Sequence, residues 1–165
     1  MKRTLLRIVL LIGLLCTFVI IFKFSAQNGQ DSGSLSRKVI EKAINIFPYT
    51  KNLSNETKLK MIEHAQPIVR KLAHFSIYTL VGICIMGFIS TFNIILLKRF
   101  LISLFVGLIY AISDEYHQSF VPGRGPSIRD VCIDTAGVFF GIIIVLIIIS
   151  VFKALAEGVG KKKEA

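Results

Sequence analysis

Charged and polar side chains are concentrated in two short stretches of this chain, where they interrupt apolar sequence. Residues 114–134 have the sequence DEYHQSFVPGRGPSIRDVCID, which places carboxylates, arginines and a histidine between two strongly apolar segments. Residues 70–75, RKLAHF, begin another apolar segment with an arginine, a lysine and a histidine. Ionisable groups at membrane depth are costly, so they usually face a cavity or a bundle interior and mark a functional site. We therefore expect the functional site where these two stretches meet.

These residue types suit two kinds of chemistry. A carboxylate beside a histidine can act as a general acid–base pair. The candidate catalytic residues are Asp114, His74, His117 and Glu115. Arginines close to a helix N-terminus favour the binding of a phosphate or another anion. The candidate ligand-binding residues are Arg70, Lys71, Tyr78, Gln118, Arg124, Arg129, Asp130 and Asp134.

Two further interpretations use the same side chains. Basic and acidic groups occur in equal numbers in the two stretches. This balance is expected of a closed ion-pair network, because an unpaired charge in a membrane costs about 2.5 kcal/mol or more. The least favoured interpretation is a metal site, because a divalent cation requires surplus carboxylate. Its ligands would be His74, His117, Asp114 and Asp130. We predict no metal and no cofactor. The network, a binding or transport site for an anion, and acid–base catalysis all remain open, and with them the question whether the protein is an enzyme.

The elements that must position these residues are membrane-spanning helices. The chain has 165 residues, of which 53% are apolar, and a mean hydropathy of +0.68. A helix needs about 20 apolar residues to cross a bilayer. We predict an all-α polytopic membrane protein, in which four transmembrane helices form one small bundle and a single domain over residues 1–165. The predicted spans are residues 5–24, 68–97, 99–118 and 128–152, and residues 25–67 form an extracytoplasmic loop.

Residue spacing places the polar groups of the second and third spans on single helix faces. Arg70, His74 and Tyr78 follow one another at intervals of four, and residues at that interval share a face. On the third span, Asp114 shares a face with small residues such as Gly107. Small residues let neighbouring transmembrane helices approach closely. Asp114 is therefore expected on the packed side of its helix rather than toward lipid.

The fourth span repeats this arrangement. Asp130 and Asp134 continue into Gly137 and Gly141, which have the GxxxG spacing. Ser127 followed by Asp130 resembles a capping box, which predicts a helix start near Ser127. Three polar stripes that end at the same depth predict a shared polar chamber.

The long loop is expected to contain one or two short amphipathic helices. Residues 36–47 place apolar side chains on one face and charged side chains on the other, and Pro48 ends this pattern. We expect this helix to cap the bundle. Residues 54–66 form a second, weaker candidate, after which Pro67 suits the first position of the second span.

The distribution of positive charge predicts the orientation. The net charge is +10, and lysines and arginines precede the first span, fill the turn after the second and follow the fourth. The positive-inside rule then places both termini in the cytoplasm and the polar cluster at the outer face. The basic residues suit contact with anionic lipid better than binding to nucleic acid. We predict no nucleic acid partner, and the sequence does not give the oligomeric state.

Three segments resemble the VanZ-like family of bacterial membrane proteins. They are RKLAHFSIY, DEYHQSFVPGRGPSIRDVCIDTAGVFFG and FSAQNGQDSGSLS. The resemblance extends from the first span to the fourth, and its polar positions are those selected above from the residues alone. It implies a multi-pass protein of the bacterial cell membrane with a role in the cell envelope. It also implies reduced sensitivity to teicoplanin-type glycopeptides as a possible outcome, and a membrane lipid or a lipid-linked envelope precursor as the partner.

Overall fold

The structure is a computed structural model that describes residues 2–163, apart from the side chains of residues 2, 29–32 and 158–163. Within this part of the chain it contains six helices and no strand, which confirms the predicted all-α class. The helices are α1 (Lys2–Ser25), α2 (Gly29–Ile46), α3 (Pro48–Lys51), α4 (Asn55–Ser90), α5 (Leu96–Gln118) and α6 (Ile128–Lys163).

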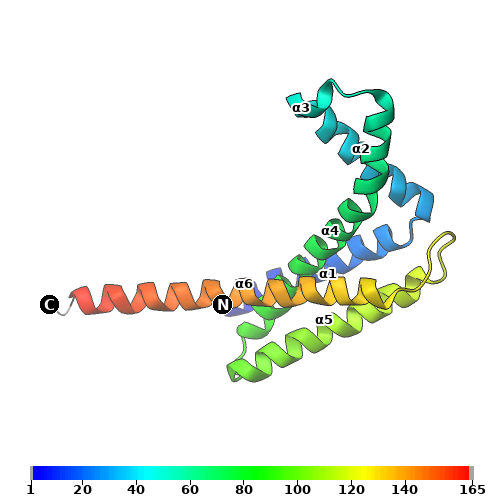
Figure 1. The fold of residues 1–165 in the computed structure, drawn as a ribbon. Helices are drawn as coiled ribbons and strands as arrows, with labels where there is room; N and C mark the ends of the chain where they lie inside the picture. The colour runs from blue at the N-terminus through cyan, green and yellow to red at the C-terminus, as the bar shows by residue number, and fades with distance from the viewer. Residues whose placement is uncertain (1, 164–165) are drawn as a thin grey trace.

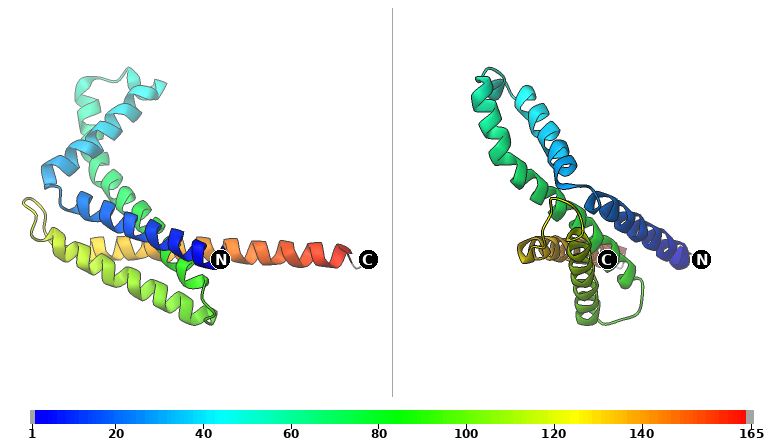
Figure 2. Two further views of the ribbon diagram at one scale, coloured as in Figure 1. Left: turned by 180° about the vertical axis from the view of Figure 1, so that it is seen from behind. Right: turned by 90° about the vertical axis from the view of Figure 1, so that its right-hand side faces the viewer.

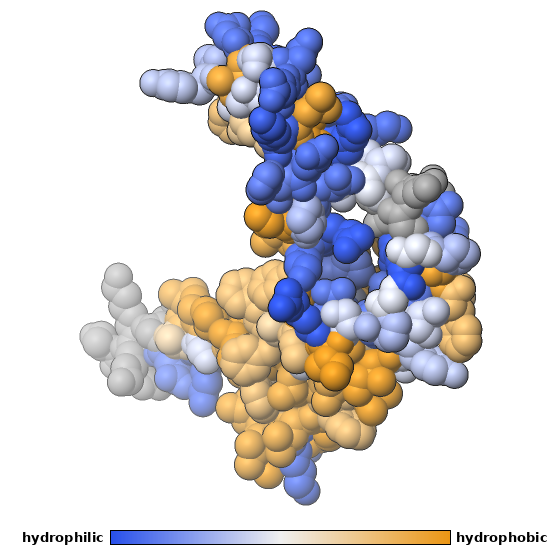
Figure 3. All heavy atoms as spheres, turned by 45° about the vertical axis from the view of Figure 1, so that its right-hand side comes forward, coloured by the Kyte–Doolittle hydropathy of each residue, from blue (hydrophilic) through white to orange (hydrophobic). Residues whose placement is uncertain are grey.

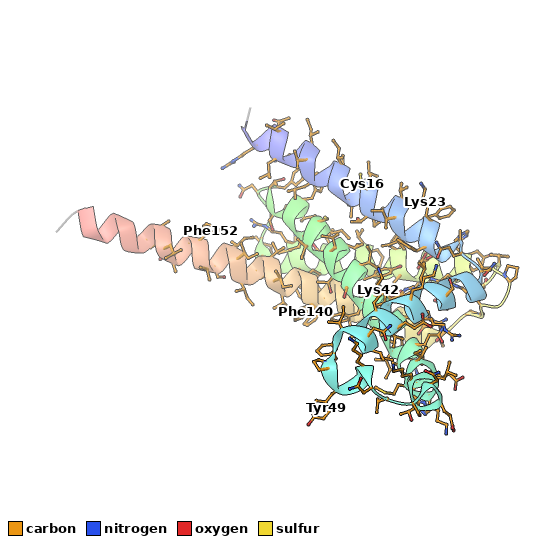
Figure 4. All side chains as sticks on the ribbon, turned by 90° about the horizontal axis from the view of Figure 1, so that it is seen from above. Cys16, Lys23, Lys42, Tyr49, Phe140 and Phe152 are labelled. Atoms are coloured by element: carbon orange, nitrogen blue, oxygen red, sulfur yellow. The ribbon has the colours of Figure 1, made fainter. Side chains whose placement is uncertain are left out.

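Four of these helices, α1, α4, α5 and α6, are long and apolar enough to cross a membrane. This result confirms the prediction of four spanning helices. Apolar side chains cover the outside of the four-helix body, whereas hydrophilic side chains gather over its upper end and over the arm that rises from it (Figure 3). Phe152, for example, is 68% exposed and points away from α6 (Figure 4). Such a surface suits hydrocarbon, in which apolar groups need no cover.

The tightest packing in the bundle joins α4 to α6, which run side by side (Figure 1). Gly82 of α4 lies against the backbone of Val138, and Gly141 of α6 lies against the backbone of α4. A Cβ atom added at Gly137 would lie 2.5 Å from the carbonyl oxygen of Phe75. The glycines therefore allow backbone contact between the two helices, as the GxxxG spacing predicted.

Helix α4 differs from the prediction at both of its ends. It begins at Asn55, with Ser54 as its N-cap, and continues through Pro67. The expectation that Pro67 occupies the first position of this helix is therefore wrong. A proline removes one backbone hydrogen bond from a helix, but here the segment before Pro67 is held in place by packing against α2. The helix then ends at Ser90 rather than near residue 97, because a turn precedes the start of α5 at Leu96.

Helices α2 and α3 form an arm together with the first part of α4 (Figure 2). Ile40 and Ile44 of α2 pack on Ile62 of α4, with Ala65 and Val69 beside them. The predicted amphipathic helix over residues 36–47 exists and starts earlier than expected. Its expected position as a cap on the bundle is wrong, because its apolar face finds a partner along α4 rather than across the ends of the spans.

The connections divide the bundle into two ends. The N-terminus and the turn between α4 and α5 lie at one end, and the loop between α5 and α6 lies at the other (Figure 1). At the first end, Arg7 of α1 donates hydrogen bonds to the Thr91 hydroxyl (3.0 Å) and the Thr91 carbonyl oxygen (2.9 Å). The second end, which we call the polar end, holds Ser25, Gln118 and the loop before α6.

Candidate functional site

A cavity of about 130 Å³ opens at the polar end, between α4, α5, α6 and the loop that joins α5 to α6. The residues that line it are Arg70, Lys71, His74, Gln118, Gly123, Arg124, Gly125, Asp130, Ile133 and Asp134. Seven of these ten residues were predicted from the sequence, and two more are the loop glycines on either side of Arg124. The two polar stretches of the sequence are thus brought together in space.

Helix length sets the depth of this cavity. Arg70 lies about 30 Å along α4 from Ser90, at a rise of about 1.5 Å per residue. A hydrocarbon core is also about 30 Å thick. With the turn after Ser90 at one membrane face, Arg70 lies at the boundary of the opposite face, and His74 lies one turn deeper.

Gln118 is the centre of the hydrogen-bond network. Its Nε2 donates to Asp114 Oδ2 (2.8 Å) and to the Ser25 hydroxyl (3.3 Å). Its Oε1 accepts from Nη1 of Arg124 (3.0 Å). The same amide therefore joins α1, α5 and the loop before α6, and orients both a carboxylate and a guanidinium.

Two pairs of oppositely charged groups join α4 to α6. Lys71 Nζ lies 3.7 Å from Asp130 Oδ1. One turn deeper, His74 Nδ1 lies 3.6 Å from Asp134 Oδ1, which is beyond hydrogen-bond distance. Asp134 is 1% exposed, and neither of its carboxylate oxygens accepts a hydrogen bond within the described part of the chain. This carboxylate is consequently the least satisfied acidic group of the cavity.

The two arginines of the cavity have no acidic partner among the side chains that the structure describes. Arg124 donates to Gln118 and, through Nη2, to the Phe24 carbonyl oxygen at 3.5 Å. Among the described residues, neither Arg70 nor Arg124 forms an ion pair with a carboxylate. Burial lowers the pKa of the Arg124 guanidinium, and the positive charge of Arg70 lowers this pKa further. Because an arginine stays protonated in proteins, the two side chains present uncompensated positive charge.

A second hollow of about 310 Å³ adjoins the charged cavity and is mainly apolar. It lies between α1, α2 and α4, and its apolar walls come from Ile21, Phe24, Leu35, Val39, Val69, Ala73 and Ile77. We call it the apolar groove. Arg70, His74 and Arg124 line both the groove and the charged cavity. A hydrophobic surface and a positively charged one therefore meet at the same three side chains.

Besides Asp114, four of the candidate residues lie away from the walls of the charged cavity. Arg129 is exposed on α6. His117 stacks on Phe22 of α1 with ring centroids 4.4 Å apart. Tyr78 is fully buried behind the cavity, next to the carboxylates of Asp114 and Asp134. The fourth residue is Glu115, which faces the loop.

Glu115 and Ser127 together fix the start of α6. Ser127 Oγ accepts from the Asp130 backbone N–H (3.3 Å), which confirms Ser127 as the predicted cap. The side chain of Asp130 does not complete the capping box. Glu115 Oε1 instead accepts from the Ser127 backbone N–H at 2.6 Å. Asp130 is left available for Lys71.

The first span contributes to the site in a way that the residue patterns did not predict. Ser25 is 1% exposed and accepts from Gln118, and the Phe24 carbonyl accepts from Arg124. In the loop, Gly123 has φ of 77°, a conformation that favours glycine. The one available signal for α1 was the FSAQ sequence at its end, which belongs to a segment that resembles the VanZ-like family.

These features define a polytopic helical membrane protein with its polar side chains concentrated at one end of a four-helix bundle. The sequence model of the VanZ/LLP1 family matches residues 9–149. The chain therefore belongs to the VanZ-like family. The match reaches into all four spans and includes every candidate site residue. No curated protein and no solved structure matches the chain.

Proposed function

We propose that this protein binds an anionic lipid of the cell envelope, such as a lipid-linked phosphate. The negatively charged head group would occupy the charged cavity, and the hydrocarbon chain would lie in the apolar groove. The observation that carries the proposal is that Arg70 and Arg124 line both hollows and have no carboxylate partner among the described residues.

The positions of the two hollows suit an amphiphile. A free phosphate or a soluble peptide would use the charged cavity and leave the groove unoccupied. A neutral lipid would use the groove and leave two guanidinium groups without a counter-charge. An anionic lipid satisfies both surfaces, and its head group would also relieve the repulsion between Arg70 and Arg124.

The head group is expected to supply most of the selectivity. A lipid chain that moves from the bilayer into an apolar groove leaves one hydrocarbon environment for another, so it gains little free energy. A hydrogen bond to a charged group contributes about 1.5–3 kcal/mol. Each arginine should therefore change the affinity by about tenfold or more, because 1.4 kcal/mol corresponds to one factor of ten.

We further propose that the cavity faces the extracytoplasmic side, with both termini in the cytoplasm. The positive charge in the first turns of α1 and α5 supports this orientation. A protein that holds or presents an anionic lipid at the outer face would alter the surface that teicoplanin-type glycopeptides meet. The resemblance to VanZ-like proteins supports such a role in the envelope.

Binding can be measured with the full chain in detergent, using a short-chain polyprenyl phosphate and isothermal titration. We expect Arg70→Gln and Arg124→Gln each to weaken binding by about tenfold or more. The matched control is Arg37→Gln, because Arg37 lies in α2, pairs with Glu41 and lines neither hollow. The uncharged polyprenyl alcohol tests the role of the head group, and inorganic phosphate tests the role of the chain.

Three results would contradict the proposal. The first is equal binding of the phosphate and the alcohol. The second is binding of inorganic phosphate as tight as that of the lipid. The third is an equal loss of affinity in Arg37→Gln and Arg124→Gln. In cells, teicoplanin tolerance of variants expressed at matched levels would then show whether lipid binding has the expected consequence.

A second candidate function is general acid–base chemistry on the bound lipid. The observation that favours it is the pair formed by His74 and the buried Asp134, 3.6 Å apart on the wall of the cavity. Mass spectrometry of the lipid after incubation tests this alternative. A product formed by the natural protein and by Arg37→Gln, but not by His74→Ala or Asp114→Asn, would establish catalysis. Recovery of unchanged lipid would restrict the function to binding.

A further inference from the structure

His74 and Asp134 of the cavity wall form, together with the buried Asp114, a group of three side chains that are typical metal ligands. His74, Asp114 and Asp134 each offer one ligand atom, and these atoms all lie within 4.8 Å of one another. The three residues come from α4, α5 and α6, so the group is formed only when the bundle is assembled. We propose that His74, Asp114 and Asp134 bind a divalent transition-metal ion such as Zn²⁺ or Mn²⁺.

The separations suit a single ion. Zn²⁺ binds nitrogen and oxygen ligands at about 2.0–2.2 Å, so two ligands of one ion lie at most about 4.4 Å apart. His74 Nδ1 and Asp134 Oδ1, at 3.6 Å, are within that limit but too far apart for a hydrogen bond. The outer limit of 4.8 Å for the whole group requires an adjustment of only a few tenths of an ångström.

The burial of Asp134 is the independent observation that points to a ligand. Its side chain is 1% exposed, it lines the cavity, and neither carboxylate oxygen accepts a hydrogen bond from a described residue. A buried carboxylate without partners is costly. A bound cation would supply the missing interaction, and the imidazole of His74 would serve as a neutral ligand.

The charges of the site are arranged so that a cation is compatible with the nearby arginines. Over the whole polar end, positive and negative groups balance, which argued against a metal at the sequence level. In the structure, Lys71 is engaged by Asp130, and Arg124 is held by Gln118 and the Phe24 carbonyl. The three-residue group has two carboxylates and one histidine, so it carries surplus negative charge whether or not the imidazole is protonated.

Asp114 also accepts a hydrogen bond of the kind that commonly orients a metal ligand. Its Oδ2 accepts from Gln118 Nε2 at 2.8 Å, and that nitrogen also approaches the Ser25 hydroxyl. Hydrogen bonds of this kind orient a carboxylate ligand and affect metal affinity. A mixture of one imidazole and two carboxylates suits Zn²⁺ or Mn²⁺ better than an all-oxygen site would.

The test uses the full chain in detergent after treatment with a chelator, and no lipid. Isothermal titration with Zn²⁺ and with Mn²⁺ should show saturable binding of one ion by the natural protein. We expect Asp134→Asn and His74→Gln to bind at least about tenfold more weakly. The matched control is Glu63→Gln, which removes an exposed carboxylate on the same helix as His74, lines neither hollow and should leave metal binding unchanged. Size-exclusion chromatography verifies that each variant remains folded.

Two outcomes would overturn the proposal. One is the absence of saturable binding by the natural protein. The other is an equal loss of affinity in Glu63→Gln and Asp134→Asn, which would indicate attraction to general negative charge. If Asp134→Asn fails to fold, His74→Gln decides, because His74 is partly exposed and glutamine keeps a polar group beside Asp134. The experiment contains no lipid, so a failure of the proposed lipid binding leaves its result intact.

Discussion

At the scale of single residues, the site depends on a few side chains that each make hydrogen bonds to several others. Gln118 contacts a carboxylate, a hydroxyl and a guanidinium from three different parts of the chain. The Lys71–Asp130 pair is different, because about a third of each side chain is exposed. Exposed ion pairs contribute about 0–1 kcal/mol. A structural network of ion pairs alone therefore accounts poorly for the cost of burying Asp114 and Asp134.

Replacement of Gln118 by methionine should destabilise the protein. Methionine has a similar length, but it leaves Asp114 without a hydrogen-bond donor and Arg124 without an acceptor. An unsatisfied buried polar group costs about 1–3 kcal/mol, more when it is charged. Denaturant unfolding in detergent would measure the loss. Ser113→Ala is the control, because Ser113 is exposed on the same helix and bonds only to the Ile109 carbonyl. Equal stability of Gln118→Met and Ser113→Ala would show that the Gln118 network is not stabilising.

At the scale of elements, the close contact between α4 and α6 sets the positions of the site residues. His74 and Asp134 lie one to two turns from the glycines at which these helices touch. A change in the separation of the helices would therefore change the distance between His74 and Asp134. The packing of α4 against α6 in the apolar body therefore also determines the geometry of the polar cavity.

Gly137→Ala should lower stability even though alanine is the better helix former. The added methyl group would press on the backbone of α4 near Phe75, and such overpacking costs about 1–3 kcal/mol. Gly13→Ala is the matched control, because its Cβ would lie at an ordinary 3.8 Å from Cys84 Sγ. The control should gain up to about 1 kcal/mol from helix propensity. Thermal unfolding of both variants measures the difference, and a gain in both would contradict the close contact.

The sequence predicted these elements well where a pattern is local. Hydropathy gave the four spans, the Ser127 cap marked the start of α6, and the GxxxG spacing indicated its packed face. The features that it did not predict depend on contacts between distant segments. Pro67 remains within α4 because α2 packs beside it.

The site shows the same division between local and distant effects. The residues that gather at the cavity were identified from their types and spacing. The hydrogen-bond and ion-pair partners of these residues were not identified from the sequence. Ser25 and Phe24 approach from α1, and Asp130 faces Lys71 only after the bundle forms. Arg129 and His117 had the expected residue types, but helix rotation directs them elsewhere.

At the scale of the whole molecule, the two ends of the bundle differ in chemistry. Arg7 and Arg99 lie at the end that holds the α4–α5 turn, whereas the acidic groups and the arm lie at the other. The positive-inside rule assigns the first end to the cytoplasm. The arm and the charged cavity would then share the extracytoplasmic side.

Cysteine labelling in intact cells tests this orientation. With Cys16, Cys84 and Cys132 replaced by alanine, Tyr49→Cys should react with a membrane-impermeant maleimide, because Tyr49 is 96% exposed at the tip of the arm (Figure 4). Lys153→Cys, beyond the other end of the bundle, should react only after the cells are lysed. The reverse pattern would place the cavity in the cytoplasm.

The unbroken course of α4 has one more consequence. The first turns of this helix form part of the arm, and the turns that follow carry Arg70 and His74. A molecule that binds the arm from outside would therefore tilt this helix and shift Arg70 and His74, two side chains of the charged cavity. Pro67 lies between the two portions and lacks one backbone hydrogen bond, so we expect the helix to bend at this position. Binding of a molecule to the arm would thereby change the geometry of the charged cavity without any contact at the cavity itself.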